Sequence, residues 1–201
     1  MRSILDGVAV DRTVARPGVN LNARPESYAG DYATPASHID RIRRALGGRI
    51  ACDPASSARA QGTVRAEVYF TIEDDGLAQP IWLSPWMLNT PSARRDEFYA
   101  RAAKEAAGGA EGVIVAGAKH TFTRYFQPLW PHVRAVHWPA VRLVFVREDE
   151  RAGDESPTDG HVFLYVGRNP ERFCACGVPL MSSMSLAAGN CPRCASELER
   201  V

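Results

Sequence analysis

The sequence predicts an α+β fold with a mixed or antiparallel sheet, two or three helices and a small C-terminal lobe that contains four cysteines. Segments of alternating β-branched and aromatic residues indicate strands, and segments with apolar residues every three or four positions indicate helices. The two kinds are interspersed without a regular βαβ repeat. At 201 residues the chain is long enough for one domain with an appendage. We therefore expect an extended arm over 1–34, a body over 35–167 and the lobe over 168–201.

The arm is predicted from its turn-forming residues. Pro17 and Pro25 interrupt it, and no hydrophobic period is sustained before residue 35.

The first helix is predicted over 37–46. Ile39, Ile42 and Leu46 fall on one face, Ser37 can cap the start, and a glycine pair follows the end. The opposite side carries three arginines that we expect to contact nucleic acid: Arg41, Arg43 and Arg44.

Alternation predicts a strand over 63–72, a hairpin-like turn at 73–76 and a return strand over 77–83. A second helix is predicted from Thr90 or Ser92 to Gly108, because an apolar stripe runs along it. Three further strands are predicted over 112–117, 140–148 and 161–167. The acidic segment 147–160 between the last two is typical of a solvated loop.

Composition limits the classes of function. The net charge of +1 argues against bulk attraction to nucleic acid or membranes, although it leaves local patches open. No apolar run is long enough to span a membrane, and the start of the chain does not resemble a secretory signal. We therefore expect a cytoplasmic protein, in which clustered cysteines are more often metal ligands than disulfides.

The cysteines form two close pairs near the end of the chain, in the pattern C-x-C-x14-C-x2-C. Four thiolates suit a tetrahedral zinc ion, so the predicted Zn2+ ligands are Cys174, Cys176, Cys191 and Cys194. The segment 173–198 resembles the zinc-ribbon class of zinc fingers, with C-x-C in place of the usual C-x2-C. Four protein ligands leave no position for water, which predicts a structural ion. An iron site and a redox pair are the alternatives.

A basic and aromatic stretch without any Asp or Glu runs from 112 to 147. Basic groups bind phosphates and exposed rings stack on bases, so the predicted nucleic-acid contacts are Lys119, Arg124, Tyr125, Trp130, Arg134, Trp138 and Arg142. The alternative is that the rings belong to the core and the arginines flank strands.

Catalytic motifs are not recognised, and no motif predicts a small-molecule substrate. The lone Cys52 is interpreted as a small buried residue. The favoured hypothesis is a non-enzymatic zinc-containing subunit of a nucleoprotein complex that contacts DNA or RNA and other protein subunits, for example in a CRISPR-type RNA-guided effector. A structural protein of a virion or other large particle is the second hypothesis. An enzyme that uses His120, His132 or His137 is the third.

Overall fold

The computed structural model of the protein describes residues 33–139, 143, 145 and 160–175. The helices are α1 (Ala36–Ala45), α2 (Gln61–Val64), α3 (Arg95–Ala107) and α4 (Pro170–Ala175), with the 3-10 helices η1 (Ala118–Phe122) and η2 (Gln127–His132). The strands are β1 (Cys52–Asp53), β2 (Val68–Tyr69), β3 (Trp86–Asn89), β4 (Gly112–Gly117), β5 (Val133–His137) and β6 (His161–Val166). In these residues the fold is α+β with a mixed sheet, as predicted.

The six strands form one sheet in the order β2-β1-β3-β4-β6-β5. β1 is parallel to β2 and β3, and β3 is parallel to β4. β6 is antiparallel to both of its neighbours, so β5 runs in the direction of β4. The carboxyl ends of β1 to β5 therefore meet at one edge of the sheet, here called the carboxyl edge. Their starts lie at the opposite edge, the amino edge.

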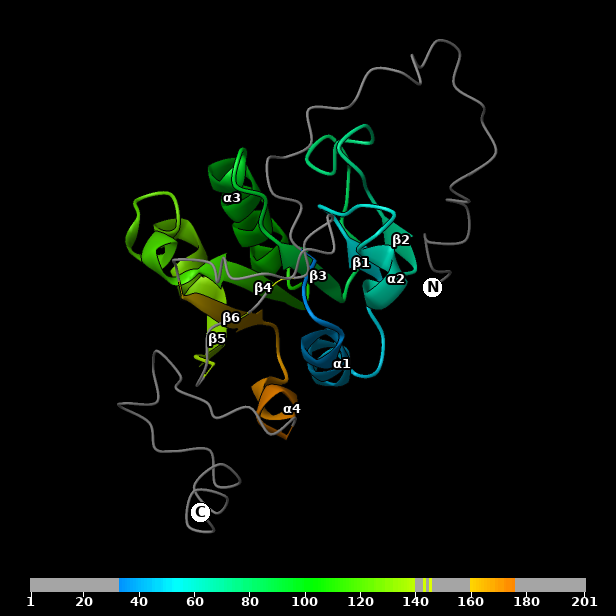
Figure 1. Ribbon diagram of the computed structural model, residues 1–201. Helices are drawn as coiled ribbons and strands as arrows, with labels where there is room; N and C mark the ends of the chain where they lie inside the picture. Colours follow the sequence, from blue (N-terminus) through cyan, green and yellow to red (C-terminus); the bar gives the residue numbers. More distant parts are fainter. Residues whose placement is uncertain (1–32, 140–142, 144, 146–159, 176–201) are drawn as a thin grey trace, which may run out of the picture.

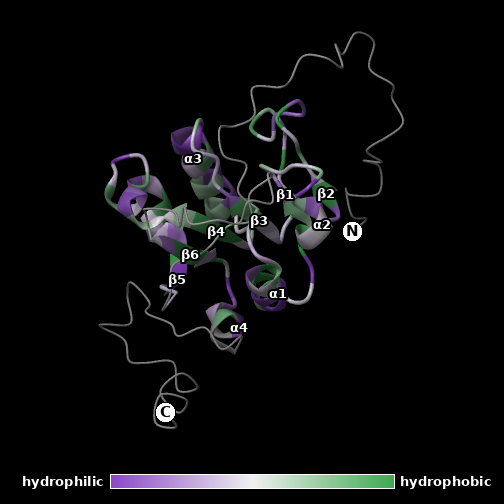
Figure 2. Ribbon diagram, viewed as in Figure 1, coloured by the Kyte–Doolittle hydropathy of each residue, from purple (hydrophilic) through white to green (hydrophobic). Residues whose placement is uncertain are grey.

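Helices cover both faces of the sheet (Figure 1). One face packs against α3 and η2 through Trp86, Leu88 and Ile114, and the other packs against α1, α2 and α4 through Met87 and Val113. Because both faces are buried, β4 is apolar along its length (Figure 2). None of the helices in the described part of the chain is long and apolar enough to cross a membrane.

Several sequence predictions are confirmed. α1 buries Ile39 and Ile42, and the predicted strands over 112–117 and 161–167 correspond to β4 and β6. The starts of the two helices were predicted wrongly, because α1 follows Pro35 and α3 begins only after Arg94. The predicted ends are confirmed, since the glycine pair follows α1 and Gly108 is the C-cap of α3.

The predicted hairpin over 63–83 is wrong. Residues 61–64 form α2, the strand is limited to the two residues of β2, and no strand covers 77–83. The chain turns after β2 because the Asp74 carboxylate accepts hydrogen bonds from the Thr71 amide and hydroxyl, at 3.1 and 2.9 Å. β2 then pairs in parallel with β1, which the sequence did not indicate as a strand.

Strands β3 and β5 were also missed, because the sequence predicts no strand over either of them. The predicted strand over 140–148 lies outside the described residues, apart from Leu143 and Phe145, which are buried on the α1 face. Residues 1–32 of the predicted arm also lie outside them.

Candidate functional site

The carboxyl edge contains a point where the chain diverges between β1 and β3. From β1 the chain passes through α2 to β2, and α2 lies on the α1 face of the sheet. From β3 it passes through α3 to β4, on the opposite face. In open sheets of this kind, ligands bind in the crevice outside the carboxyl ends of the two strands that diverge. Asp53 ends β1 at this point, and Asn89 ends β3.

The Asp53 side chain is buried, with 3% of its surface exposed. Its Oδ2 accepts a hydrogen bond from Gln61 Nε2 at 3.1 Å. The Ser56 hydroxyl and the Ala55 amide also favour the ionised form. Burial outweighs them and raises the pKa of Asp53 to about 6. Oδ1 has no hydrogen bond of normal geometry within the described residues. Asp53 therefore retains an unsatisfied acceptor at the position where a ligand is expected.

The loop after β2 closes against the loop after β1. A Cβ on Gly76 would lie 1.8 Å from the carbonyl oxygen of Pro54, so only glycine permits this approach. Trp82 Nε1 donates to the Gly76 carbonyl at 2.8 Å. Arg94, which precedes α3, binds Asp75 of the same loop at 2.9 Å. The loops after β1 and β2 and the start of α3 are thereby held together around Asp53.

A second buried polar group lies beside the end of β3. The Tyr99 side chain extends from α3 to the region of Thr90, and burial raises the pKa of its hydroxyl to about 12. Within the described residues this hydroxyl has no hydrogen bond of normal geometry. Thr90 continues the pairing of β3 with β4, because its amide donates to the Val115 carbonyl.

At the end of β4 the chain turns into η1. His120 folds back over Gly117, where a Cβ would lie 2.8 Å from the His120 ring. The His120 Nδ1 atom lies 3.3 Å from Arg95 Nη1 at the start of α3. The carboxyl edge therefore combines an acid, a tyrosine and a histidine beside an arginine.

The predicted basic and aromatic contacts divide between core and surface. Trp130 is half-buried, packs against Phe126 and donates its indole N–H to the Thr121 carbonyl, so it stabilises η1. Tyr125 and Trp138 are 42% and 45% exposed. The Arg124 guanidinium lies over the Tyr125 ring, 4.6 Å from its centroid.

Lys119 and Arg134 are exposed, whereas Arg142 lies outside the described residues. Since η1 follows β4 and Trp138 follows β5, Lys119 and Trp138 lie at the carboxyl edge. The structure thus brings part of the predicted surface to the same edge as Asp53. Phe122, which was not singled out from the sequence, is 80% exposed at the end of η1.

The arginines of α1 are not equivalent. Arg41 and Arg44 are exposed. Arg43 is half-buried and donates to Asp40 and to the carbonyls of Thr63 and Val64, so it joins α1 to α2. Arg43 is therefore a structural residue in this fold.

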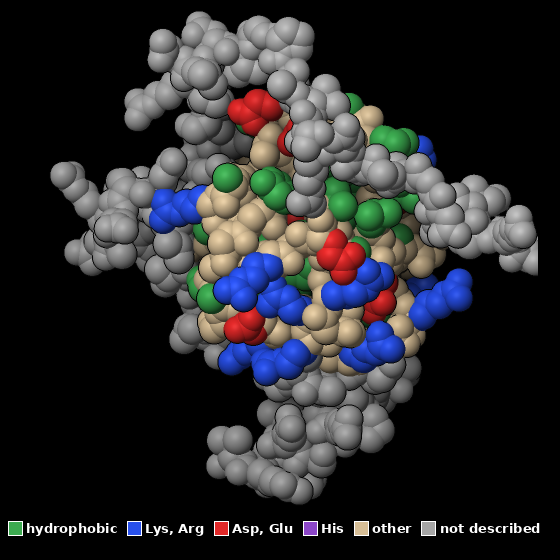
Figure 3. Space-filling view, turned by 90° about the vertical axis from the view of Figure 1, so that its right-hand side faces the viewer, with side chains coloured by type: hydrophobic (Ala, Val, Ile, Leu, Met, Phe, Trp, Pro, Cys, Tyr) green, Lys and Arg blue, Asp and Glu red, His purple; other side chains and the backbone are tan. Residues whose placement is uncertain are grey.

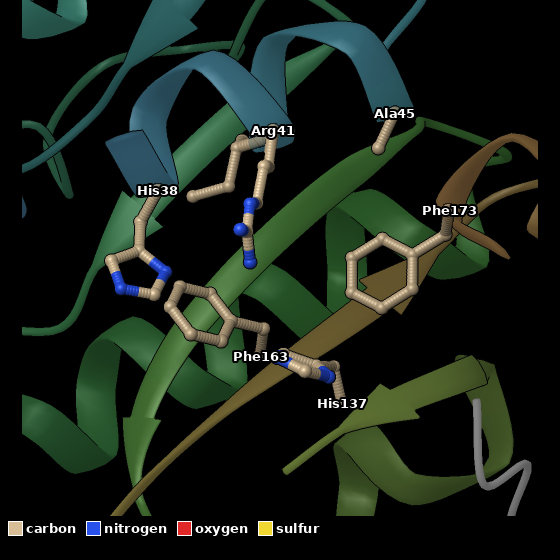
Figure 4. A pocket seen from close by; sticks show the side chains of 7 residues that line it. His38, Arg41, Ala45, His137, Phe163 and Phe173 are labelled. Carbon is tan, nitrogen blue, oxygen red and sulfur yellow. The ribbon is translucent and has the colours of Figure 1, made fainter. Parts of the chain in front are cut away.

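A small pocket of about 10 Å³ lies on the opposite face of the sheet from α3, lined by His38, Arg41, Ile42, Ala45, His137, Phe163 and Phe173. Figure 4 shows His38 and Arg41 extending from α1 toward the Phe163 ring, with Phe173 approaching from α4. Burial and the neighbouring Arg41 lower the pKa of His38. The volume suits about one water molecule. Among the three histidines proposed for catalysis, only His137 lines this pocket.

The predicted zinc ligands cannot be placed. Cys176, Cys191 and Cys194 lie outside the described residues, and only the backbone of Cys174 is described, within α4. The described residues contain no group of three or more metal-binding side chains arranged around a common point. Cys52 is buried as predicted, and burial, with Asp53 beside it, raises the pKa of its thiol to about 12.

Sequence reasoning missed Asp53, Asn89 and Tyr99. The first two follow short apolar runs and precede a proline by one or two residues, which is a signal for the end of a strand. Only the parallel pairing of β1 with β3 makes these ends neighbours.

Comparison of the sequence with protein-family models gave no match, and a search of curated proteins also found none.

Proposed function

We propose that this protein binds a nucleoside-containing cofactor at the carboxyl edge, with Asp53 accepting a hydrogen bond from one of its hydroxyl groups. The observation that carries the proposal is the unsatisfied Oδ1 of a buried carboxylate at the divergence between β1 and β3. A ribose hydroxyl can donate to this atom, and acidic side chains at the crevice of nucleotide-binding sheets have this role. The buried Tyr99 hydroxyl supplies a second polar group at the same edge.

The strand order suggests which cofactor to test first. One antiparallel strand, β6, lies between the last two strands of an otherwise parallel sheet. Methyltransferases that depend on S-adenosylmethionine share this arrangement. The likeness is one of topology alone, and topology alone does not define a function. The buried acceptor at the end of β1 would bind the sugar of this cofactor, which would supply an activated methyl group.

A nucleic-acid base is the proposed acceptor of that group. Phe122 and Trp138 expose their rings at the carboxyl edge, and exposed rings stack on unpaired bases. Lys119 and Arg124 lie near them in sequence and are exposed to solvent, where they can meet phosphates. The nucleic-acid partner is thus the one expected from the sequence, and the proposed reaction is transfer of a methyl group to one of its bases.

The second candidate is the non-enzymatic subunit of a nucleoprotein complex, stiffened by zinc at the four cysteines. The same exposed rings and basic groups favour it, because they need no cofactor in order to bind DNA or RNA. The CRISPR-type effector and the large-particle protein are settings for this candidate. The two candidates differ in whether Asp53 binds a ligand.

The test is calorimetric titration of the purified full chain with S-adenosylmethionine, S-adenosylhomocysteine, ATP and NAD. Asp53→Asn keeps the size of the side chain and removes its charge. Glu67→Gln is the matched control, because Glu67 precedes β2 at the amino edge. We expect Asp53→Asn to weaken binding about tenfold or more, since a hydrogen bond to a charged group is worth roughly 1.5–3 kcal/mol. Absence of binding to all four compounds, or equal affinities for the two variants, would contradict the cofactor proposal.

A further inference from the structure

The amino edge of the sheet gathers exposed arginines that come from separate segments of the chain. They are Arg44, Arg49, Arg65, Arg168 and Arg172, here called the amino-edge surface. Figure 3 shows Lys and Arg side chains over the lower half of the face that it presents, with acidic side chains interspersed among them. This surface lies at the other end of the sheet from Asp53.

Contacts show that the fold brings these arginines together. Arg44 lies in the last turn of α1, which ends at the amino edge because the chain then leads into β1. Gly47 follows with a φ of +77°, and Arg172 Nη1 of α4 lies 3.2 Å from where its Cβ would be. Arg168 Nη2 lies 3.6 Å from the corresponding point at Gly109, which precedes β4. Segments before β1 and β4 and after β6 thus meet at one edge.

The described acidic groups nearby are already engaged. Glu67 pairs with Arg49 at 3.0 Å, and Glu111 Oε1 accepts a hydrogen bond from the Tyr165 hydroxyl. Arg44, Arg65 and Arg172 remain exposed, which leaves an excess of positive charge at this edge. Arginine presents a planar fork of donors that matches phosphate oxygens.

We propose that the amino-edge surface binds the phosphate backbone of nucleic acid. Among the described residues, none of the exposed large apolar side chains lies in the segments that carry these arginines, so the contact positions the strand without reading its bases. This inference goes beyond the proposed function, because it concerns the edge that does not carry the cofactor. The helix α4, which carries Arg172, also contains Cys174, the first of the predicted zinc ligands.

The phosphate contact is tested by fluorescence anisotropy with labelled single-stranded DNA, duplex DNA and RNA, titrated with the full chain from 50 to 300 mM KCl. The variant is the double substitution Arg44→Gln and Arg172→Gln. The matched control is Arg41→Gln with Arg59→Gln, which removes two exposed arginines that lie outside the amino-edge surface, in α1 and in the loop after β1. All four substituted arginines are exposed, and a thermal unfolding curve by circular dichroism checks that each variant folds.

We expect the plot of log K against log salt to become shallower by about 2 in the double variant, because each phosphate contact contributes about one to that slope. If the slope for one of the three nucleic acids is the same in the double variant and in wild type, that nucleic acid does not use this surface. A slope unchanged from wild type, or an equal loss in the control, would overturn the inference. Absence of binding to all three nucleic acids would also overturn it, and a sedimentation assay with phosphatidylserine vesicles would then test the membrane alternative. Loss of cofactor binding in Asp53→Asn leaves this result unaffected, so the two proposals fail separately.

Discussion

Asp53 makes the stability of this protein depend on pH in a direction opposite to that of an ordinary salt-bridged acid. The pKa of its carboxyl rises from an ordinary value of 3.8 to about 6 in the folded chain, chiefly through burial. Below pH 3.8 the carboxyl is protonated in both states and folding is unaffected. Between pH 3.8 and 6 the folded state keeps the proton while the unfolded state releases it, so the free energy of unfolding falls as pH rises. Above pH 6 the full cost is present.

The magnitude follows from the two pKa values. At 1.36 kcal/mol for each pH unit, ionised Asp53 lowers the free energy of unfolding by about 3 kcal/mol at pH 7.5. Asp53→Asn cannot ionise and carries no such cost. Its amide changes the hydrogen bonds to Gln61 by an amount that does not vary with pH. The variant-minus-wild-type difference in unfolding free energy should therefore grow by about 3 kcal/mol between pH 3.5 and 7.5.

The assay is urea unfolding followed by tryptophan fluorescence, with Trp82 and Trp86 as buried reporters. Measurements are made at half-unit steps of pH on wild type, Asp53→Asn and Glu67→Gln. The control should track wild type to within about 1 kcal/mol, because Glu67 belongs to an exposed ion pair. In the contrary case, the difference in unfolding free energy between Asp53→Asn and wild type stays constant or shrinks as pH rises. Either result would refute the conclusion that ionised Asp53 destabilises the folded chain. Such a cost is typical of groups kept for binding.

Three further outcomes are expected. Arg101→Met should lower the free energy of unfolding by about 3 kcal/mol in urea titrations. It removes hydrogen bonds to three loop carbonyls and leaves the largely buried Glu105 carboxylate, 13% exposed, without its partner. A loss below about 1 kcal/mol would show that the loop holds without Arg101. Gly112→Ala should lower the thermal midpoint measurably, since its Cβ would lie 2.4 Å from the Trp86 ring, and an unchanged midpoint would contradict this close packing. Elemental analysis should find one zinc per chain in wild type and in Cys52→Ser, and little in Cys191→Ser; equal zinc in both variants would argue against the four-thiolate site.

The sequence predicted the elements whose burial is uniform or regularly periodic. α1 was recognised because Ile39 and Ile42 recur at helical spacing, and β4 because all its residues are apolar. Both signals depend on local pattern alone, which burial against the sheet enforces.

The remaining elements depend on partners that are distant in sequence. β1 and β2 each have only two residues, too few for alternation to be seen, and their parallel pairing is set by the α2 crossover. β3 carries Trp86, Met87 and Leu88 in succession, because both faces of the sheet are covered, and this run resembles a helix start as much as a strand. The candidate site could not be predicted for the same reason: Asp53 and Asn89 become neighbours only through the strand order.

The two proposed contact regions lie at opposite ends of the same strands, and this sets the length of duplex that can reach both. β4 has six residues, so its ends are separated by roughly 20 Å at about 3.3 Å per residue. Successive phosphates of one strand advance about 3.4 Å. A duplex with this rise needs about six base pairs to pass from one end of β4 to the other.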